Sequence, residues 1–469
     1  MSDFSVPRRA GAAIIRPQIQ SSSGNLLKNS GSSRKPEPQI IPRPAHNVSR
    51  AEISKSALKV LYRLNKAGYQ AFLVGGGVRD ALLELHPKDF DIATDAHPDE
   101  VKALFGNCRL IGRRFRLAHV RFGPEVIEVA TFRAATDGED EHPDAARDDE
   151  GRILRDNVYG TIEEDVWRRD FTCNALYYNI ADFSIWDYVG GVEDIRNRQL
   201  KLIGDPDTRL REDPVRMLRA VRFAAKLDFT IDKAVDRAMR NSVELLRNVP
   251  PARLFDEFLK MFQAGHAQKT FHLLRDYGLF RQLFPETDEH LDRDETFRRF
   301  VDAALVNTDK RVGAGMSVTP MFLVGVFLWA PVRERALELQ DEEGMSVAQS
   351  LAAAGWDLTS AQQSRISIPK RFTAPMREML ALQPRFDNTK GRRAQKLLEH
   401  RRFRAAYDFL VLRAEVGEID DELATFWTEV QAEPQERRDE AFDVRAPGNK
   451  KSKRRRRRRR RRGKSSASS

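Results

Sequence analysis

Hydrophobic and polar residues follow two different periods between residues 50 and 190. Apolar positions with helical spacing begin near Glu52 and stop at Gly68, which predicts an amphipathic helix. Strand and helix patterns then alternate, with strands expected at 71–74, 90–93, 116–122 and 126–132, and helices expected at 78–85 and 98–105. A helix pattern near Glu163 and apolar alternation over 176–180 follow. This mixture predicts one α+β unit.

The flanking segments have a different character. Helical periods dominate beyond residue 190, over 215–226, 234–246, 254–262 and much of 267–435. Residues 136–158 are acidic and turn-rich, and we expect a mobile loop there. Residues 1–49 are rich in Ser, Pro, Gly and Gln, and the segment from about 446 is low-complexity. Both ends are therefore predicted to be disordered.

Charge is distributed unevenly along the 469 residues, whose net charge is +11. Thirteen cationic residues and no acid lie between 450 and 464, residues 1–50 carry +6, and residues 51–445 therefore carry −8. The folded part is acidic, whereas both ends are basic. A run such as the nine arginines at 454–462 binds polyanions. We favour RNA as its partner over an acidic protein or an anionic lipid surface, and the sequence does not identify which RNA-degradation or RNA-chaperone proteins are partners.

Targeting signals and cysteine pairs are missing from the sequence. No segment has the ~18 apolar residues of a membrane helix, and the N-terminus lacks the apolar region of a secretory signal. Cys108 and Cys173 are far apart in the sequence, and both are expected to be small buried residues. We therefore expect a cytoplasmic protein of two to three folded units.

The strongest chemical signal is the segment VGGGVRDALLELHPKDFDIAT. Glycines let the backbone approach an anion closely. The amides of Gly76 and Gly77 at a helix start, with Arg79 one turn on, favour a triphosphate. In a strand, Asp89 and Asp91 share a face. Paired carboxylates suit Mg²⁺, which binds carboxylate and phosphate oxygens, whereas a solvated turn is the alternative for an isolated Asp-x-Asp.

A third acid, Glu128, lies inside the apolar strand pattern 126–132. A carboxylate there is costly to bury without a cation or hydrogen-bond donors, which favours a metal ligand. The alternative is an edge strand with Glu128 facing water. His119, in the strand pattern 116–122, is interpreted as structural rather than catalytic.

The motifs occur in an order that resembles a known family. GGGVRD and DFD are followed by LIGRRFRLAHVRF, EVATFR, RRDFTCNAL and REDPVRMLRAVRFA. Together they resemble the polymerase-β-type nucleotidyltransferases, which include bacterial poly(A) polymerase and the CCA-adding enzymes of the eubacterial and eukaryotic class. The match covers roughly residues 55–260. IGRRFRLAHV and the arginine-rich tail are similar to the poly(A) polymerase branch.

The resemblance implies a role for each matching residue. Asp89 and Asp91 match the metal-binding pair, Glu128 matches the third acid, and Asp170 matches an acid of the active site. The residues implied to bind the nucleotide are Gly76, Gly77, Arg79, Arg169, Asn174, Glu212, Asp213 and Arg216. The last three match a helical motif that recognises the base.

From the residues alone, these assignments have structural alternatives. Asp213 and Arg216 are three apart in a helical pattern, so an intrahelical salt bridge is the alternative to base recognition. For Arg168 and Arg169, the alternative to a role in the site is that both side chains are simply solvated.

The resemblance also implies the architecture and the reaction. It implies an α+β fold, in which a polymerase-β-like nucleotidyltransferase head with a mixed sheet precedes an all-helical neck and body. The expected boundaries are a disordered extension at 1–49, the catalytic head at 50–190, the neck at 191–265, the RNA-binding body at 266–445 and a disordered Arg-rich tail at 446–469. The implied reaction adds AMP from ATP to RNA 3′ ends with two Mg²⁺ ions. A CCA-adding enzyme and a non-catalytic RNA-binding scaffold are the alternatives.

Overall fold

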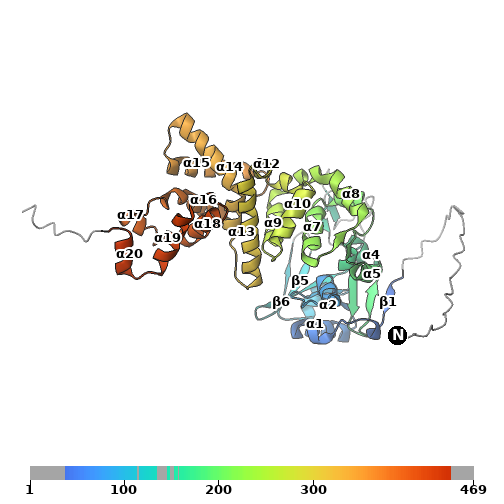
Figure 1. The fold of residues 1–469 in the computed structure, drawn as a ribbon. Coiled ribbons are helices and arrows are strands. Elements are labelled where there is room, and N and C mark those ends of the chain that lie inside the picture. Colours follow the sequence, from blue (N-terminus) through green and yellow to red (C-terminus); the bar gives the residue numbers. More distant parts are fainter. Residues whose placement is uncertain (1–36, 113–115, 135–144, 148–152, 157, 445–469) are drawn as a thin grey trace, which may run out of the picture. The chain divides into compact units, whose positions relative to one another are not determined.

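The computed structural model describes residues 37–112, 116–134, 145–147, 153–156 and 158–444. An eight-stranded sheet in the first part has the strand order β1-β10-β9-β2-β3-β6-β5-β4 (Figure 1). Its strands are β1 Gln39–Ile41, β2 Ala71–Val74, β3 Asp91–Thr94, β4 Cys108–Ile111, β5 Leu117–Phe122, β6 Glu125–Thr131, β9 Leu176–Asn179 and β10 Ile185–Asp187. Neighbouring strands are antiparallel except β3 and β6, which run parallel. The predicted mixed sheet is therefore confirmed.

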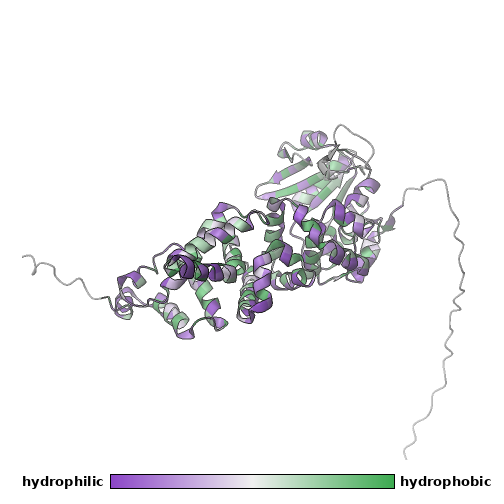
Figure 2. Cartoon of the chain, turned by 90° about the horizontal axis from the view of Figure 1, so that it is seen from above, coloured by the Kyte–Doolittle hydropathy of each residue, from purple (hydrophilic) through white to green (hydrophobic). Residues whose placement is uncertain are grey.

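Helices cover both faces of this sheet. The helices up to residue 196 are α1 Lys55–Lys66, α2 Gly76–Leu82, α3 Pro98–Leu104, α4 Ile162–Arg168 and α5 Gly191–Arg196. α1 and α3 join the core that contains Leu73 of β2. α4 packs through Val166 on the other face, against Phe72 and Tyr177, because successive strand residues point to opposite faces. Figure 2 shows hydrophobic residues concentrated in the strands between these layers.

Helices account for most of the chain beyond residue 200. They are α6 Pro206–Glu212, α7 Val215–Leu227, α8 Lys233–Ser242, α9 Pro251–Phe262, α10 Ala267–Asp276, α11 Leu279–Leu283, α12 Pro285–Arg293, α13 Glu295–Gly313, α14 Pro320–Glu343, α15 Val347–Gln362, α16 Lys370–Ala381, α17 Gly391–Gln395, α18 Phe403–Glu415, α19 Asp421–Ala432 and α20 Gln435–Ala441. Phe327 of α14 is a centre of their core, with five phenylalanine rings 5.2 to 6.2 Å from its own. Within the described residues, no helix is long and apolar enough to cross a membrane.

Several sequence predictions need correction. The neck is not purely helical, because β11 (Gln199–Leu200) pairs in parallel with β12 (Thr230–Ile231). Disorder is wrong for residues 37–49, because β1 pairs with β10 and buries Ile41. Cys108 is only partly buried, because it lies on the edge strand β4, whereas Cys173 is buried.

The remaining differences concern local boundaries. In the predicted loop 136–158, the described residues form an antiparallel pair, β7 (Ala145–Arg147) and β8 (Ile153–Asp156). The rest of that loop, residues 1–36 and the tail from 445 lie outside the described residues. The described chain from Pro38 onward belongs to one compact unit, so the boundaries between head, neck and body stay predictions.

Candidate active site

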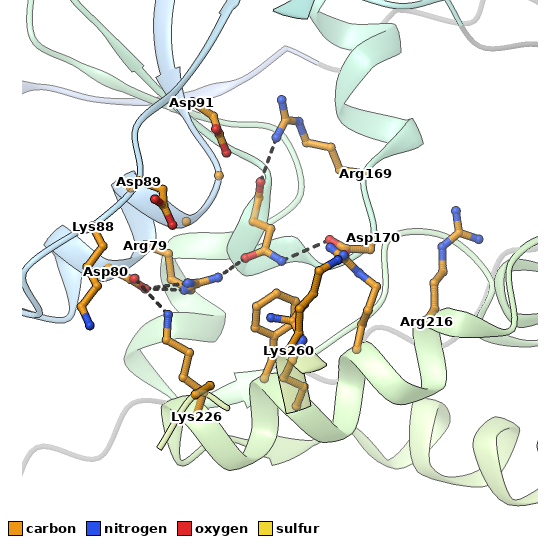
Figure 3. A pocket seen from close by; sticks show the side chains of 18 of the residues that line it. Arg79, Asp80, Lys88, Asp89, Asp91, Arg169, Asp170, Arg216, Lys226 and Lys260 are labelled. Atoms are coloured by element: carbon orange, nitrogen blue, oxygen red, sulfur yellow. Dashed lines mark hydrogen bonds and ion pairs between the residues drawn. The ribbon is translucent and has the colours of Figure 1, made fainter. Parts of the chain in front are cut away.

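A cleft of about 1300 Å³ is lined by residues of the head and the neck and by Val312 of α13 (Figure 3). All twelve site residues expected from the sequence line it. The lining carries twelve Lys and Arg side chains against seven Asp and Glu. The cleft is therefore cationic, although residues 51–445 are acidic as a whole, and this favours a polyanionic ligand.

The glycine turn joins β2 to α2 at one side of the cleft. Gly75 adopts a φ of 67°, which a side chain disfavours. A Cβ on Gly77 would lie 3.4 Å from the carbonyl oxygen of Asp89, so the turn packs tightly against the segment before β3. α2 begins at Gly76 rather than at residue 78 as predicted, which places the first helical amides within the turn.

Arg79 is more constrained than the sequence suggested. Its guanidinium is buried, donates to Asp80 at 2.6 and 2.8 Å, and also donates to Asn174. Asp80 in turn pairs with Lys226 of α7 at 3.3 Å (Figure 3). Asp80 therefore joins the head to the neck, and together with Asn174 it holds Arg79 in a fixed position in the cleft.

Three polar side chains form a row across neighbouring strands. Asp91, the first residue of β3, is in register with Glu128 of β6, and Glu128 is in register with His119 of β5. His119 Nε2 lies 3.2 Å from Glu128 Oε1. Asp89 lies just before β3, and the intervening Phe90 is buried. The cleft thus gathers Asp89, Asp91 and Glu128, but β3 begins at Asp91, so Asp89 and Asp91 do not lie in one strand as expected.

The pKa of Asp91 is raised to about 6. Loss of hydration within the cleft is the largest cause, and the negative charges of Glu128 and Asp89 add to it, whereas Arg169 opposes it. Carboxylates that repel each other in this way fit a cation between them.

Asp170 has its charge already paired. It accepts hydrogen bonds from the Phe171 amide at 2.8 Å, Asn174 Nδ2 at 3.1 Å and Arg219 Nε at 2.7 Å. Burial raises the pKa of Asp170, but the Arg219 charge and these hydrogen bonds outweigh it and lower the pKa. A carboxylate held in this way is a poor proton acceptor and is suited to positioning.

Arg169 belongs to a second buried network. Its Nε donates to Tyr177 Oη at 2.7 Å and to Asp165 at 3.2 Å, and its Nη1 donates to the Asn174 carbonyl at 3.3 Å. Burial lowers the pKa of Arg169, but Tyr177 and Asp165 raise it by more. These contacts fix the position of Arg169, whose charge also lowers the pKa of Asp91.

The neck residues are arranged differently from the prediction. α6 ends at Glu212 and α7 begins at Val215, so Asp213 and Arg216 do not share one helix. Asp213 pairs with Arg253 of α9 at 2.6 Å. Arg216 instead approaches Glu212 at 3.1 Å and donates to a backbone carbonyl of α6. The intrahelical salt bridge between Asp213 and Arg216, which was the alternative to base recognition, is therefore not formed, and both residues line the cleft.

Some cleft residues were missed by the sequence analysis. Arg253 and Lys260 come from α9, which matches no motif, and only tertiary packing brings them here. Trp167 on α4 also lines the cleft and is 44 % exposed. The position of this aromatic residue directly before the RRDF motif could have marked it as a candidate. A single residue shows no periodicity, however, so the pattern of the chain did not indicate a role for it.

Three family models match parts of the chain. They are described as the Poly A polymerase head domain, over residues 71–201, the probable RNA and SrmB-binding site of polymerase A, over residues 228–291, and the polymerase A arginine-rich C-terminus, over residues 343–462.

Curated proteins of two kinds are similar to the chain. Poly(A) polymerase I of Salmonella typhi is 49% identical over 89% of this chain and 92% of the relative. Poly(A) polymerase I of Escherichia coli O157:H7 is 49% identical over 85% of this chain and 86% of the relative. The CCA-adding enzyme of Lactobacillus helveticus is 38% identical over 48% of this chain and 53% of the relative.

Solved structures share the fold. Apo form II of a CCA-adding enzyme has a TM-score of 0.54 and 20% identity, covering 82% of this chain and 86% of that one. The Thermotoga maritima CCA-adding enzyme complexed with tRNA has a TM-score of 0.50 and 20% identity, covering 81% and 80%. At this identity the likeness is one of architecture.

Proposed function

The chain belongs to the bacterial poly(A) polymerase family, and on that premise we propose that it extends RNA 3′ ends with AMP from ATP, releasing pyrophosphate without a template. The observation that carries the proposal is the cationic cleft with Asp89 and Asp91 among its lining residues. Cations attract both polyanionic substrates. We expect the reaction to take place in the cytoplasm, where both substrates are present.

Asp89 and Asp91 are the residues that we propose to hold Mg²⁺, with Glu128 as a third acid. The raised pKa of Asp91 supports this assignment. Two bound Mg²⁺ ions would favour ionisation of the RNA 3′-hydroxyl and neutralise developing phosphate charge. Among the described residues, no cluster of three or more acid, imidazole or thiol side chains suffices to hold an ion alone. We therefore expect substrate phosphate oxygens to complete the coordination, as is usual for Mg²⁺.

The other cleft residues are proposed to bind and orient ATP. Amides of Gly76 and Gly77 would face the phosphates, and the fixed charges of Arg79 and Arg169 would attract them. Asp170 is assigned a positioning role, because Arg219 and Asn174 hold it. The base is assigned to the neck, where Glu212 and Arg216 lie close together.

The proposed reaction predicts a strong preference for ATP and products far longer than three nucleotides. The measurement incubates protein and an RNA oligomer with each NTP separately, then with CTP and ATP together, and sizes the products. A product that stops at CCA would replace the proposal with the CCA-adding alternative. No product with any NTP would favour the non-catalytic scaffold.

Arg216→Ala is expected to weaken discrimination between ATP and the other NTPs by about tenfold or more, the value of one lost charged hydrogen bond. The comparison is kcat/KM for ATP against CTP and GTP, together with RNA affinity, which should change less. Arg237→Ala is the control, because Arg237 is exposed on α8 and does not line the cleft. If the ratio of kcat/KM for ATP to that for CTP or GTP is unchanged in Arg216→Ala, Arg216 does not recognise the base and only forms its salt bridge with Glu212.

Deletion of residues 450–469 is expected to weaken RNA binding and to leave the rate at saturating RNA nearly unchanged. This segment lies outside the described residues, and its thirteen cations are proposed to contact RNA phosphates. Each phosphate neutralised contributes about −0.7 to the salt slope for single strands, so deletion should flatten the slope. Binding is measured against salt concentration for both proteins. Equal slopes would point to an acidic protein or a lipid surface.

A further inference from the structure

Trp167 lies on the outward side of α4. Ile162 and Val166 on the same helix pack against Phe72 and Tyr177, and these contacts hold α4 on the sheet. Trp167 stays 44 % exposed. An indole that remains this exposed adds little to the hydrophobic core, so its place on α4 is not explained by packing.

Trp167 lines the same cleft as the proposed metal-binding acids. Asp91 and Glu128 lie side by side on β3 and β6. Ala93, two residues after Asp91, packs with Val166 of α4, so α4 covers the sheet face from which both acids project. The indole and the acids therefore belong to the same side of the head.

The other phenyl or indole ring in the cleft lining is already covered. Phe223 is 7 % exposed. The guanidinium carbons of Arg222, Arg79 and Arg219 lie 4.5, 5.2 and 5.6 Å from the centre of its ring. Among the described residues of the lining, Trp167 is thus the one such ring with a face left for a nucleobase.

We propose that Trp167 is the stacking platform for the 3′-terminal base of the RNA, an inference that rests on the proposed function. Most groups assigned to ATP lie on the glycine turn and on the neck. Arg169 follows α4 directly, but its guanidinium is held inward by Asp165 and Tyr177, whereas the Trp167 indole stays exposed. RNA arrives with any base at the first addition and with adenine afterwards. Stacking suits both cases, because every base has a π-face and no hydrogen-bond pattern is needed.

The proposal is tested with Trp167→Ala, Trp167→Phe and the control Trp356→Ala. Trp356 is 57 % exposed on α15, outside the cleft lining, with the Arg377 guanidinium 4.6 Å from its ring centre. KM is measured for ATP and for oligomers ending in A or in U. Trp167→Ala should raise KM for RNA about tenfold, within the range of one lost base–aromatic stack. KM for ATP should stay within about twofold, a Phe ring should retain most of the affinity, and the control should match the wild type.

A second measurement does not depend on nucleotide addition. An oligomer ending in 2-aminopurine should lose fluorescence on binding wild type and Trp356→Ala, and should keep it with Trp167→Ala. The advantage of a terminal A over a terminal U should also shrink in Trp167→Ala, because purines stack more strongly.

The outcomes separate the two proposals. A rise in KM for ATP with no change for RNA would overturn the inference and assign the indole to the incoming nucleotide. If Trp167→Ala leaves both KM values and the quenching unchanged, Trp167 does not contact either substrate, and the inference is overturned. A wild-type protein that quenches 2-aminopurine through Trp167 but adds no nucleotide would contradict the proposed function and leave the stacking site supported.

Discussion

Asp91→Ala and Asp89→Ala should each lower the rate of nucleotide addition by at least about a thousandfold, or about 4 kcal/mol in the barrier. Each change removes a carboxylate proposed to hold Mg²⁺, while Phe90 between them stays in the core. Primer extension gives the rate, and circular dichroism checks the fold. Asp99→Ala is the control, because Asp99 is an exposed head carboxylate outside the cleft lining. Activity within about tenfold of the wild type would refute the metal assignment.

The same acid gives a stability readout that is independent of activity. The pKa of Asp91 is raised to about 6 in the folded protein. The folded state is therefore destabilised, relative to the unfolded state, as the pH rises from the pKa of Asp91 in the unfolded chain through its pKa in the folded protein. Asp91→Asn removes this loss. The metal-free variant should therefore melt above the wild type at pH 8, and the two should converge near pH 4. Mg²⁺ should raise the wild-type Tm at pH 8 more than that of Asp91→Asn.

Asp165→Ala should destabilise the protein by about 3 kcal/mol, the lower end of the cost of breaking a buried ion pair. Asp165 is 4 % exposed and accepts hydrogen bonds from Arg169 at 3.1 and 3.2 Å and from Tyr177 Oη at 2.7 Å. The lower end applies because about a fifth of the Arg169 side chain remains open to water. Denaturant unfolding measures the change.

Tyr177→Phe is the matched comparison for this network. It removes one hydroxyl and keeps the Asp165–Arg169 pair, so a loss of about 1 kcal/mol is expected. Asp165→Ala should also reduce activity, because the charge that opposes protonation of Asp91 is no longer fixed in place. Equal stability of the two variants would show that the ion pair contributes nothing beyond the hydroxyl.

Local patterns were sufficient to predict five of the eight strands of the large sheet, namely β2, β3, β5, β6 and β9. In the cleft they indicated the glycine turn with Arg79 and the acids Asp89, Asp91 and Glu128, whereas the other candidates came from the resemblance. The strands bearing Asp91 and Glu128 follow from alternation of apolar residues, but their parallel pairing does not, because β4 and β5 intervene in the chain. That pairing is determined by the tertiary structure. In the sequence, only the order of the family motifs indicated that the two acids lie close together. β1 was missed for the same reason, since its partner β10 lies far along the chain.

The neck shows where local reasoning failed despite a usable signal. Pro214 disfavours helical geometry at the preceding residue, and Asp213 indeed lies between two helices. Helical spacing was nevertheless extended through this position. The partner of Asp213 is Arg253, forty residues away, and no pattern in a single sequence indicates such a contact.

The order of strands in the sheet has a consequence for synthesis on the ribosome. β2 lies in the middle of the sheet between β3 and β9, and β1 at one edge pairs only with β10. Both early strands emerge on the order of 100 residues before β9 and β10, a delay of about 5 to 20 seconds at ordinary elongation rates. During that interval the apolar β2 has an unpaired edge, which favours association with other nascent chains. The head should therefore depend on chaperones until residue 187 has left the exit tunnel.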